Sequence, residues 1–253
     1  MKLFKNNFIS TQLNRSIFRI FYFKSNIEAD VVRKLQLKYP EESNLADFIV
    51  KKVLNDGFIK LPSLDEIYLE KINDEYNYIM NFYRNLDVVY EEKEGILIRL
   101  RPLWKLKSER FMYVFSFFHN KFFFDIAKIF FNKKFGNFSF NNEIFFHKTT
   151  PTKVPLAGEY HYDIRQTLKF WLYLNDIDDK NGPMSVEKMS TNRNRSLLRE
   201  KKSDNQVNVN FHNCENLVGK KGSIFIHDTT ASHRANIVEE GYERNIIRAH
   251  SWL

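Results

Sequence analysis

Two kinds of hydrophobic spacing divide the chain at about residue 143. Before it, apolar residues recur every three or four positions, a period typical of helices packed on a core. This pattern predicts helical segments at residues 28–55, 65–84 and 108–134. The first should end at Gly57, because glycine readily takes the left-handed conformation that caps a helix. The run from Phe58 to Pro62 then reads as a short strand that proline closes.

After residue 143, short apolar runs separated by polar turns replace the helical period. The expected strands are 144–146, 160–164, 168–174, 206–211, 223–227 and 245–249. Helices first and short strands afterwards indicate an α+β fold with a β-sandwich or jelly roll in the second half. We expect a single domain over residues 1–253, with a helical N-terminal extension (1–55) and a core of helices and strands (56–253).

The composition excludes several kinds of protein and of metal site. Of 253 residues, 43% are hydrophobic and 28% are charged, which is typical of a soluble globular chain. The single cysteine, Cys214, cannot form an internal disulfide or a cysteine-based zinc site. Any metal must therefore be held by histidines and carboxylates. No run of about 18 uncharged apolar residues occurs, so no membrane span is expected.

The net charge of +8 suits an anionic partner, but no nucleic-acid-binding motif accompanies it, so a small-molecule substrate is expected rather than nucleic acid. Residues 1–27 are basic and read as a helix packed on the domain, with a transit-like segment as the alternative. The polar stretch 185–205 reads as a solvated surface loop or lid, or else as a contact for an anionic substrate. The expected location is cytoplasmic, where Cys214 stays reduced.

The candidate chemistry centres on Glu159-Tyr160-His161-Tyr162-Asp163. On a strand, residues i and i+2 point to the same face, so His161 and Asp163 would project together. One imidazole and one carboxylate supply two of the three ligands of the facial triad that binds non-haem iron. The favoured third ligand is His233, with His227 as its rival at the end of a strand.

Eleven residues after His233, Arg244 opens the last predicted strand. A guanidinium group at this place could hold a carboxylate through two parallel hydrogen bonds. Arg248 is the alternative to Arg244 for this role. The remaining histidines, at positions 119, 147, 212 and 250, read as structural or exposed.

Taken in order, these segments resemble the phytanoyl-CoA dioxygenase family of iron(II)- and 2-oxoglutarate-dependent oxygenases. The segment from Leu54 to Leu61 is similar to that family's N-terminal strand entry, and His161-Tyr162-Asp163 matches its HxD motif. The stretch from Trp171 to Met184 is similar to its next strand, hairpin and NG-containing turn. His233 and Arg244 match its distal histidine and its 2-oxoglutarate-binding arginine.

The resemblance implies a double-stranded β-helix fold, a jelly roll of the cupin type. It implies that His161, Asp163 and His233 bind Fe(II), that Arg244 binds the distal carboxylate of 2-oxoglutarate, and that Trp171 lines the co-substrate pocket. With O2 as the second co-substrate, the implied reaction is hydroxylation of a small organic substrate, which could be anionic or CoA-linked. Lys105 or Lys107 could add a further basic contact.

Three positions depart from the family pattern. Val186 to Ser190 replaces a PGSH-like sequence, Ala235 stands where a small hydroxyl residue is usual, and Tyr162 stands where glutamine is common. Asp163 is present, whereas related halogenases lack that carboxylate, so hydroxylation is the expected outcome. Two alternatives remain: a cupin-type metal enzyme that does not use 2-oxoglutarate, and a non-catalytic binding scaffold.

Overall fold

The computed structural model describes residues 26–93, 95–100, 109–132, 137–151, 159–199 and 207–253. The basic segment up to residue 25, together with Lys105 and Lys107, lies outside these residues. The described α-helices are α2 (Asn26–Lys38), α3 (Leu45–Asp56), α4 (Glu66–Phe82), α5 (Met112–Phe118), α6 (Lys121–Phe131) and α7 (Thr191–Arg199). Short 3-10 helices are η1 (Tyr83–Asn85), η3 (Glu109–Phe111) and η4 (Phe211–Asn213). None of the described helices is long and apolar enough to cross a membrane.

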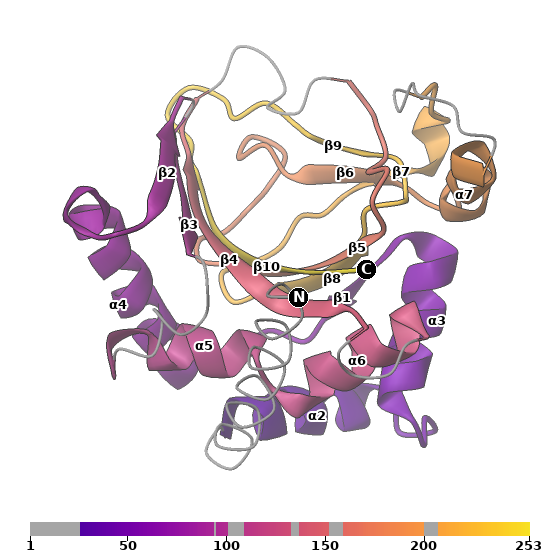
Figure 1. Cartoon of the computed structure of the whole chain (residues 1–253), viewed down its shortest axis with the longest axis horizontal. Coiled ribbons are helices and arrows are strands. Elements are labelled where there is room, and N and C mark those ends of the chain that lie inside the picture. The colour runs from indigo at the N-terminus through magenta and orange to yellow at the C-terminus, as the bar shows by residue number, and fades with distance from the viewer. Residues whose placement is uncertain (1–25, 94, 101–108, 133–136, 152–158, 200–206) are drawn as a thin grey trace, which may run out of the picture.

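Two antiparallel sheets face each other, and the helices α2 to α6 cover the convex side of the larger one (Figure 1). The strands are β1 (Phe58–Leu61), β2 (Val89–Glu92), β3 (Gly95–Leu100), β4 (Ser139–Thr149), β5 (Thr167–Tyr173), β6 (Met184–Glu187), β7 (Cys214–Asn216), β8 (Ile224–Asp228), β9 (His233–Ala235) and β10 (Arg244–Trp252). The major sheet has the order β1-β8-β5-β10-β4-β3-β2, and the minor sheet has the order β7-β6-β9. This is the expected α+β fold with a jelly-roll, double-stranded β-helix core.

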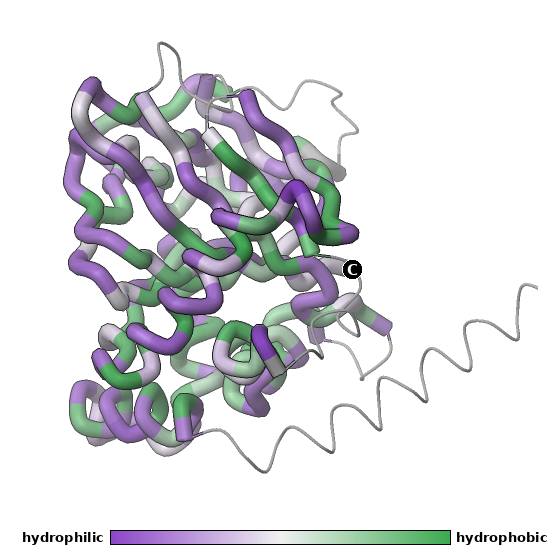
Figure 2. Tube along the Cα trace, turned by 90° about the vertical axis from the view of Figure 1, so that its left-hand side faces the viewer, coloured by the Kyte–Doolittle hydropathy of each residue, from purple (hydrophilic) through white to green (hydrophobic). Residues whose placement is uncertain are grey.

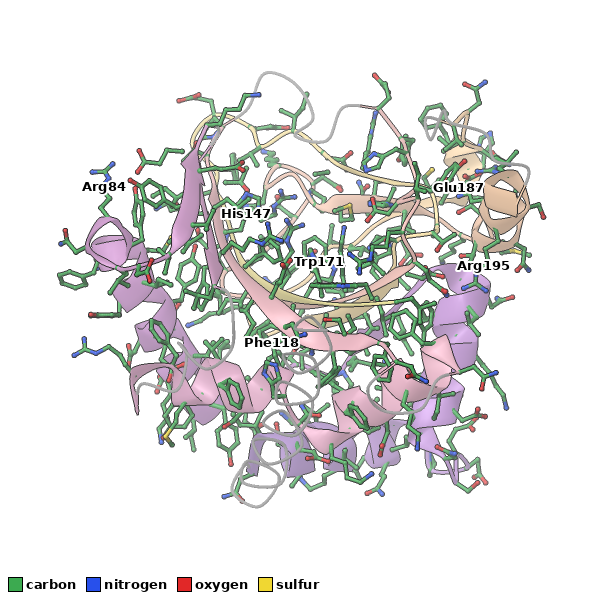
Figure 3. The ribbon with its side chains drawn as sticks, viewed as in Figure 1. Arg84, Phe118, His147, Trp171, Glu187 and Arg195 are labelled. Carbon is green, nitrogen blue, oxygen red and sulfur yellow. The ribbon has the colours of Figure 1, made fainter. Side chains whose placement is uncertain are left out.

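Strands β5 and β8 of the major sheet are buried along their whole length, but the two faces of the sheet differ in chemistry. On β5, Phe170 packs with the helices in the main core, whereas Trp171 belongs to a smaller cluster between the sheets. Figure 3 shows Phe118 on the helical side of the sheet and His147 and Trp171 on its concave side. In Figure 2, seen from the side on which β2 lies in Figure 1, the visible strands carry both hydrophilic and hydrophobic stretches.

Two of the predicted helices are each divided into two. The segment 28–55 breaks after Lys38, because Pro40 has no backbone N–H and disfavours helical geometry at Tyr39. The segment 108–134 breaks between α5 and α6, where the side chain of Asn120 accepts a hydrogen bond from the Phe123 N–H and caps α6.

Two of the predicted strands are wrong. Within 160–164 only His161 forms a β-bridge, after which the Asp163 N–H donates to the Thr229 carbonyl at 2.8 Å. Within 206–211, the described residues end in the 3-10 helix η4, where Asn210 accepts a hydrogen bond from the His212 N–H. Such a local side-chain bond competes with strand pairing.

Gly57 joins the helical layer to the sheet at the predicted left-handed cap. Its φ is +86°, and its N–H donates to the Val53 carbonyl at 2.9 Å. A Cβ at this position would lie 2.7 Å from the Cβ of Ala231. Both the left-handed backbone and the close approach of the 228–232 turn therefore require glycine.

We expect Gly57→Ala to lower the free energy of unfolding by about 2–4 kcal/mol, because a backbone penalty adds to the overlap with Ala231. Gly241→Ala is the matched control, since its φ is +81° and nothing lies within 4 Å of the added Cβ. It should lose only about 1 kcal/mol. Urea unfolding measures both changes, and equal losses would refute the role of the close contact.

Glu75 on α4 connects two helices. Its carboxylate accepts hydrogen bonds from the N–H groups of Tyr113 and Val114, at 2.9 and 2.8 Å, at the start of α5. Burial outweighs these two bonds and raises the pKa of Glu75 from 4.5 to about 7. The folded state therefore holds this proton more tightly than the unfolded state, so the associated stability is present in acid and is lost as the pH rises through 7.

Glu75→Gln should remove this pH dependence. Between pH 5 and pH 8 we expect the wild type to lose about 1–3 kcal/mol more stability than the variant, measured by urea unfolding at both pH values. Parallel pH profiles for the two proteins would contradict the raised pKa of Glu75.

Candidate metal centre

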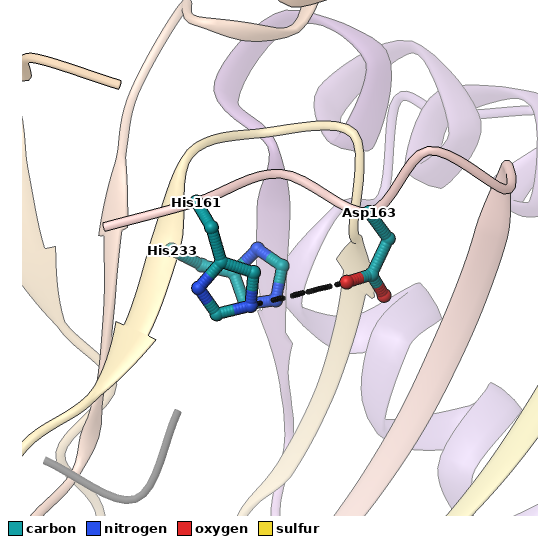
Figure 4. A group of neighbouring side chains, drawn as sticks. All are labelled: His161, Asp163 and His233. Atoms are coloured by element: carbon teal, nitrogen blue, oxygen red, sulfur yellow. Dashed lines mark ion pairs between the residues drawn. The ribbon is translucent and has the colours of Figure 1, made fainter. Parts of the chain in front are cut away.

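The three predicted ligands come together between the two sheets. The Nε2 atoms of His161 and His233 each lie 3.9 Å from Oδ1 of Asp163, and the two ring centroids are 4.6 Å apart (Figure 4). One donor atom from each residue falls within 4.8 Å of the others. These separations are consistent with one ion between them, because a donor atom lies about 2 Å from a bound divalent metal.

Backbone carbonyls orient both imidazole rings. Nδ1 of His161 lies 3.1 Å from the Glu159 carbonyl, and Nδ1 of His233 lies 2.9 Å from the Ala231 carbonyl. A carbonyl can only accept, so each Nδ1 carries the proton and each Nε2 keeps its lone pair free. Two imidazoles that present Nε2 and one carboxylate are a donor set that fits a divalent metal with open coordination positions.

Electrostatics keep Asp163 and His233 in the states that bind metal. Burial would raise the pKa of Asp163, but the charge of Lys169 and hydrogen bonds from Lys169 and Thr229 outweigh it, so the pKa is lowered. Lys169 Nζ lies 3.2 Å from Oδ2 of Asp163, which leaves Oδ1 toward the histidines. Burial, with Lys169 next, lowers the pKa of His233 to about 3, so this ring is neutral at neutral pH.

The ligands are brought together by backbone pairing between distant segments. The His161 N–H donates to the His233 carbonyl at 3.1 Å, and the His233 N–H donates to the His161 carbonyl at 2.8 Å. Asp163 is fixed by its N–H bond to Thr229. The metal site therefore forms only when the 159–163 segment pairs with β9.

The polar stretch 185–205 is not a solvated loop in its described part, because β6 and α7 occupy it. Arg193 forms two hydrogen bonds with the buried Glu187, and its Nη2 donates to Ser232 Oγ at 2.8 Å. Asn194 Nδ2 donates to the Thr230 carbonyl at 2.8 Å. Figure 3 shows Glu187 and Arg195 beside α7, away from the centre of the concave face. Five polar residues of this stretch are buried: Ser185, Glu187, Ser190, Thr191 and Asn194. Of these, Glu187, Ser190 and Asn194 form hydrogen bonds to residues 230–232, in the turn before His233.

Arg244 and Trp171 lie on the concave face of the major sheet. Arg244 is 3% exposed, donates to the Gly182 carbonyl, and has an Nη2 atom 3.4 Å from Thr149 Oγ1. Burial lowers its pKa to about 10, so it remains charged at neutral pH. The Trp171 side chain is 3% exposed, and its Nε1 is buried with no partner among the described residues.

The rival ligand His227 is fully buried and packs edge-on against the His233 ring at 4.7 Å. It does not belong to the group of three donors. His119 is structural, with its ring nitrogens 3.2 and 2.9 Å from the carbonyls of Phe115 and Asn141, and His212 is exposed.

Sequence reasoning missed Lys169 on the concave face, read His147 and His250 as structural or exposed, and named Arg248 only as the alternative to Arg244. In the sequence, only their even spacing along a strand indicates that they share a face with known site residues. Lys169 precedes Trp171 by two positions, and Arg248 follows Arg244 by four. Strands buried on both faces rarely show this period clearly.

No family profile matches the sequence, and no curated protein sequence matches it. Similar solved structures exist nonetheless. The non-heme alpha ketoglutarate dependent epimerase SnoN from nogalamycin biosynthesis has a TM-score of 0.57 at 13% identity, over 81% of this chain and 81% of that chain. The carbocyclase SnoK from the same biosynthesis has a TM-score of 0.57 at 14% identity, over 83% and 84%.

EctD from S. alaskensis, solved with 2-oxoglutarate and 5-hydroxyectoine, has a TM-score of 0.56 at 13% identity, over 80% of this chain and 74% of that chain. These similarities show that this chain has the fold of non-haem iron, 2-oxoglutarate-dependent enzymes.

We expect Asp163→Ala and His161→Ala each to weaken Fe(II) binding by more than about 100-fold, because each removes a ligand and not merely a residue that orients one. Anaerobic equilibrium dialysis against Fe(II) measures the affinity. His212→Ala, which changes an exposed histidine, is the control and should bind as the wild type does. Unchanged affinity in the Asp163 variant would refute the assignment of the site.

Proposed function

We propose that this chain is an Fe(II)- and 2-oxoglutarate-dependent dioxygenase that hydroxylates a small organic substrate. The observation that carries the proposal is the convergence of His161, Asp163 and His233 with both Nδ1 atoms bonded to carbonyls. The fold supports it, because structures such as SnoN and EctD with iron or 2-oxoglutarate bound share this architecture.

Arg244 is the proposed partner of the distal carboxylate of 2-oxoglutarate. It is buried on the concave face, stays protonated, and pairs across the strands with Thr149, whose hydroxyl could add a second hydrogen bond. A buried guanidinium without a carboxylate partner is costly, and an anionic co-substrate would offset that cost. Trp171, with its unpartnered Nε1, would form part of the same pocket wall.

When bound, Fe(II) with 2-oxoglutarate and O2 supplies an oxidant for C–H hydroxylation, while 2-oxoglutarate is converted to succinate and CO2. The chain's own residues fix the geometry. His161 and His233 present Nε2 lone pairs, and Asp163 contributes one negative charge that Lys169 keeps ionised. Apolar side chains between the sheets, including Phe58 and Val186, exclude bulk water from the centre.

SnoN is described as an epimerase and SnoK as a carbocyclase, so enzymes with this fold catalyse more than one kind of reaction. Hydroxylation and membership of the phytanoyl-CoA dioxygenase family are therefore parts of the proposal that rest on the sequence motifs, above all on Asp163. The substrate we propose is a small molecule, acted on in the cytoplasm.

Arg244→Ala tests the use of 2-oxoglutarate. Loss of a buried charge-assisted pair should weaken 2-oxoglutarate binding to the Fe(II)-loaded chain by about 10–100-fold, at nearly unchanged Fe(II) affinity. Anaerobic titration that follows the visible absorption of the iron chelate measures both constants. Arg84→Ala is the control, because Arg84 is exposed and pairs with Glu92 far from the concave face. If 2-oxoglutarate fails to bind the wild type, the cupin-type alternative gains support.

A further inference from the structure

The concave face of the major sheet holds more positively charged side chains than the proposed metal site and 2-oxoglutarate site need. Across β3, β4, β5 and β10, its described residues include four cations and one carboxylate: Arg99, Lys169, Arg244, Arg248 and Glu143. Arg99 pairs with Glu143 at 2.5 Å, and Lys169 pairs with Asp163 at 3.2 Å. Arg244 donates to a carbonyl and lies near a hydroxyl. Arg248 is the cation that these interactions leave without a partner.

The guanidinium of Arg248 is held by aromatic rings. Its Cζ lies 5.0 Å from the ring centroid of Phe145 and 5.3 Å from that of Trp171, its cross-strand neighbours on β4 and β5. Its Nε is buried without a hydrogen-bond partner, and no ion pair joins it to a described carboxylate. Stacking fixes the plane of a guanidinium and leaves its edge free for the two parallel hydrogen bonds that an oxyanion accepts.

Other unpartnered polar atoms surround this group. Nε2 of His250 and Nδ1 of His147 are buried without partners among the described residues, and the His250 ring lies 4.4 Å from that of Phe145. Buried polar groups are normally satisfied, so their concentration on one face indicates a ligand that satisfies them. Arg248 and the proposed metal site share this face, because His250 pairs with Lys169 and Lys169 contacts Asp163.

Arg244 and Arg248 offer two separate positions. Their Cα atoms lie four residues apart on β10, about 13 Å along an extended strand. Arg244 is anchored at the end of the strand by Gly182 and Thr149, whereas Arg248 is fixed between its two rings. If Arg244 binds the distal carboxylate of 2-oxoglutarate, Arg248 remains available for another anion beside the metal.

We propose that Arg248 binds an oxyanion of the prime substrate, so that the substrate is a small organic acid carrying a carboxylate, sulfonate or phosphate group. This inference rests on the proposed function and names its substrate class. The oxyanion would accept hydrogen bonds from the free N–H groups of the Arg248 guanidinium, with His250 and His147 as neighbouring polar contacts. The carbon to be oxidised would then face the three metal ligands.

The test uses the full chain, loaded with Fe(II) under argon and saturated with 2-oxoglutarate. Calorimetric titrations with inorganic sulfate, inorganic phosphate and acetate then probe a second anion site. We expect the wild type to bind at least one of these anions, and Arg248→Met to weaken that binding at least 10-fold. The variant should change 2-oxoglutarate affinity less than 2-fold. Arg84→Met, which removes an equal charge from the surface, should bind every probe as the wild type does.

The outcomes separate the two proposals. If the wild type binds 2-oxoglutarate but none of the three anions, the oxyanion site is refuted and the proposed function stands. If Arg248→Met loses 2-oxoglutarate instead, Arg248 holds the co-substrate and the inference is wrong. If the wild type does not bind 2-oxoglutarate, the proposed function fails, whatever the anions do. Arg248→Lys guards against misfolding: it keeps the charge, and it should bind the anion more tightly than Arg248→Met.

Discussion

The site depends on one short piece of antiparallel pairing, in which His161 and His233 exchange backbone hydrogen bonds across 72 positions of sequence. This bridge places two metal ligands side by side before any side chain is considered. The adjacent carbonyls of Glu159 and Ala231 then select the tautomer that leaves both Nε2 atoms free. Ligand geometry is thus a consequence of backbone geometry, and the segments on either side serve to hold that bridge in place.

Those supporting segments come from opposite layers. From the helical side, Gly57 approaches Ala231 so closely that only a hydrogen atom fits between them. From the minor sheet and α7, Glu187, Arg193 and Ser232 form a hydrogen-bonded network around the same turn. A turn held from both sides by close packing and satisfied polar groups has few alternative conformations, which suits a site that must keep its ligands within a fraction of an ångström.

The sequence predicted the α+β fold and the residues that converge, because each has a local signature: a period, a glycine cap or an HxD spacing. It did not predict β2 and β3, which lie among the helices, or the three strands of the minor sheet. It failed where tertiary context decides. The segment 160–164 looks like a strand but pairs only at His161, and 185–205 looks solvated although Glu187 and Asn194 are buried. Arg248 entered the sequence analysis only as the alternative to Arg244, because a lone arginine in an apolar strand says nothing about its face until the neighbouring strands are known.

The two faces of β5 and β10 show how the fold separates stability from chemistry. One face buries apolar side chains such as Phe170 and Ile247 against the helices, and this burial stabilises the sheet. That stability allows the opposite face to carry Lys169, Arg244 and Arg248 out of water, which is unfavourable for the chain alone. Burial, together with repulsion from Arg244, lowers the pKa of Arg248 to about 10. The two buried cations therefore repel each other in the chain without ligands. An anionic ligand offsets that repulsion, so binding of the ligand also stabilises the folded chain.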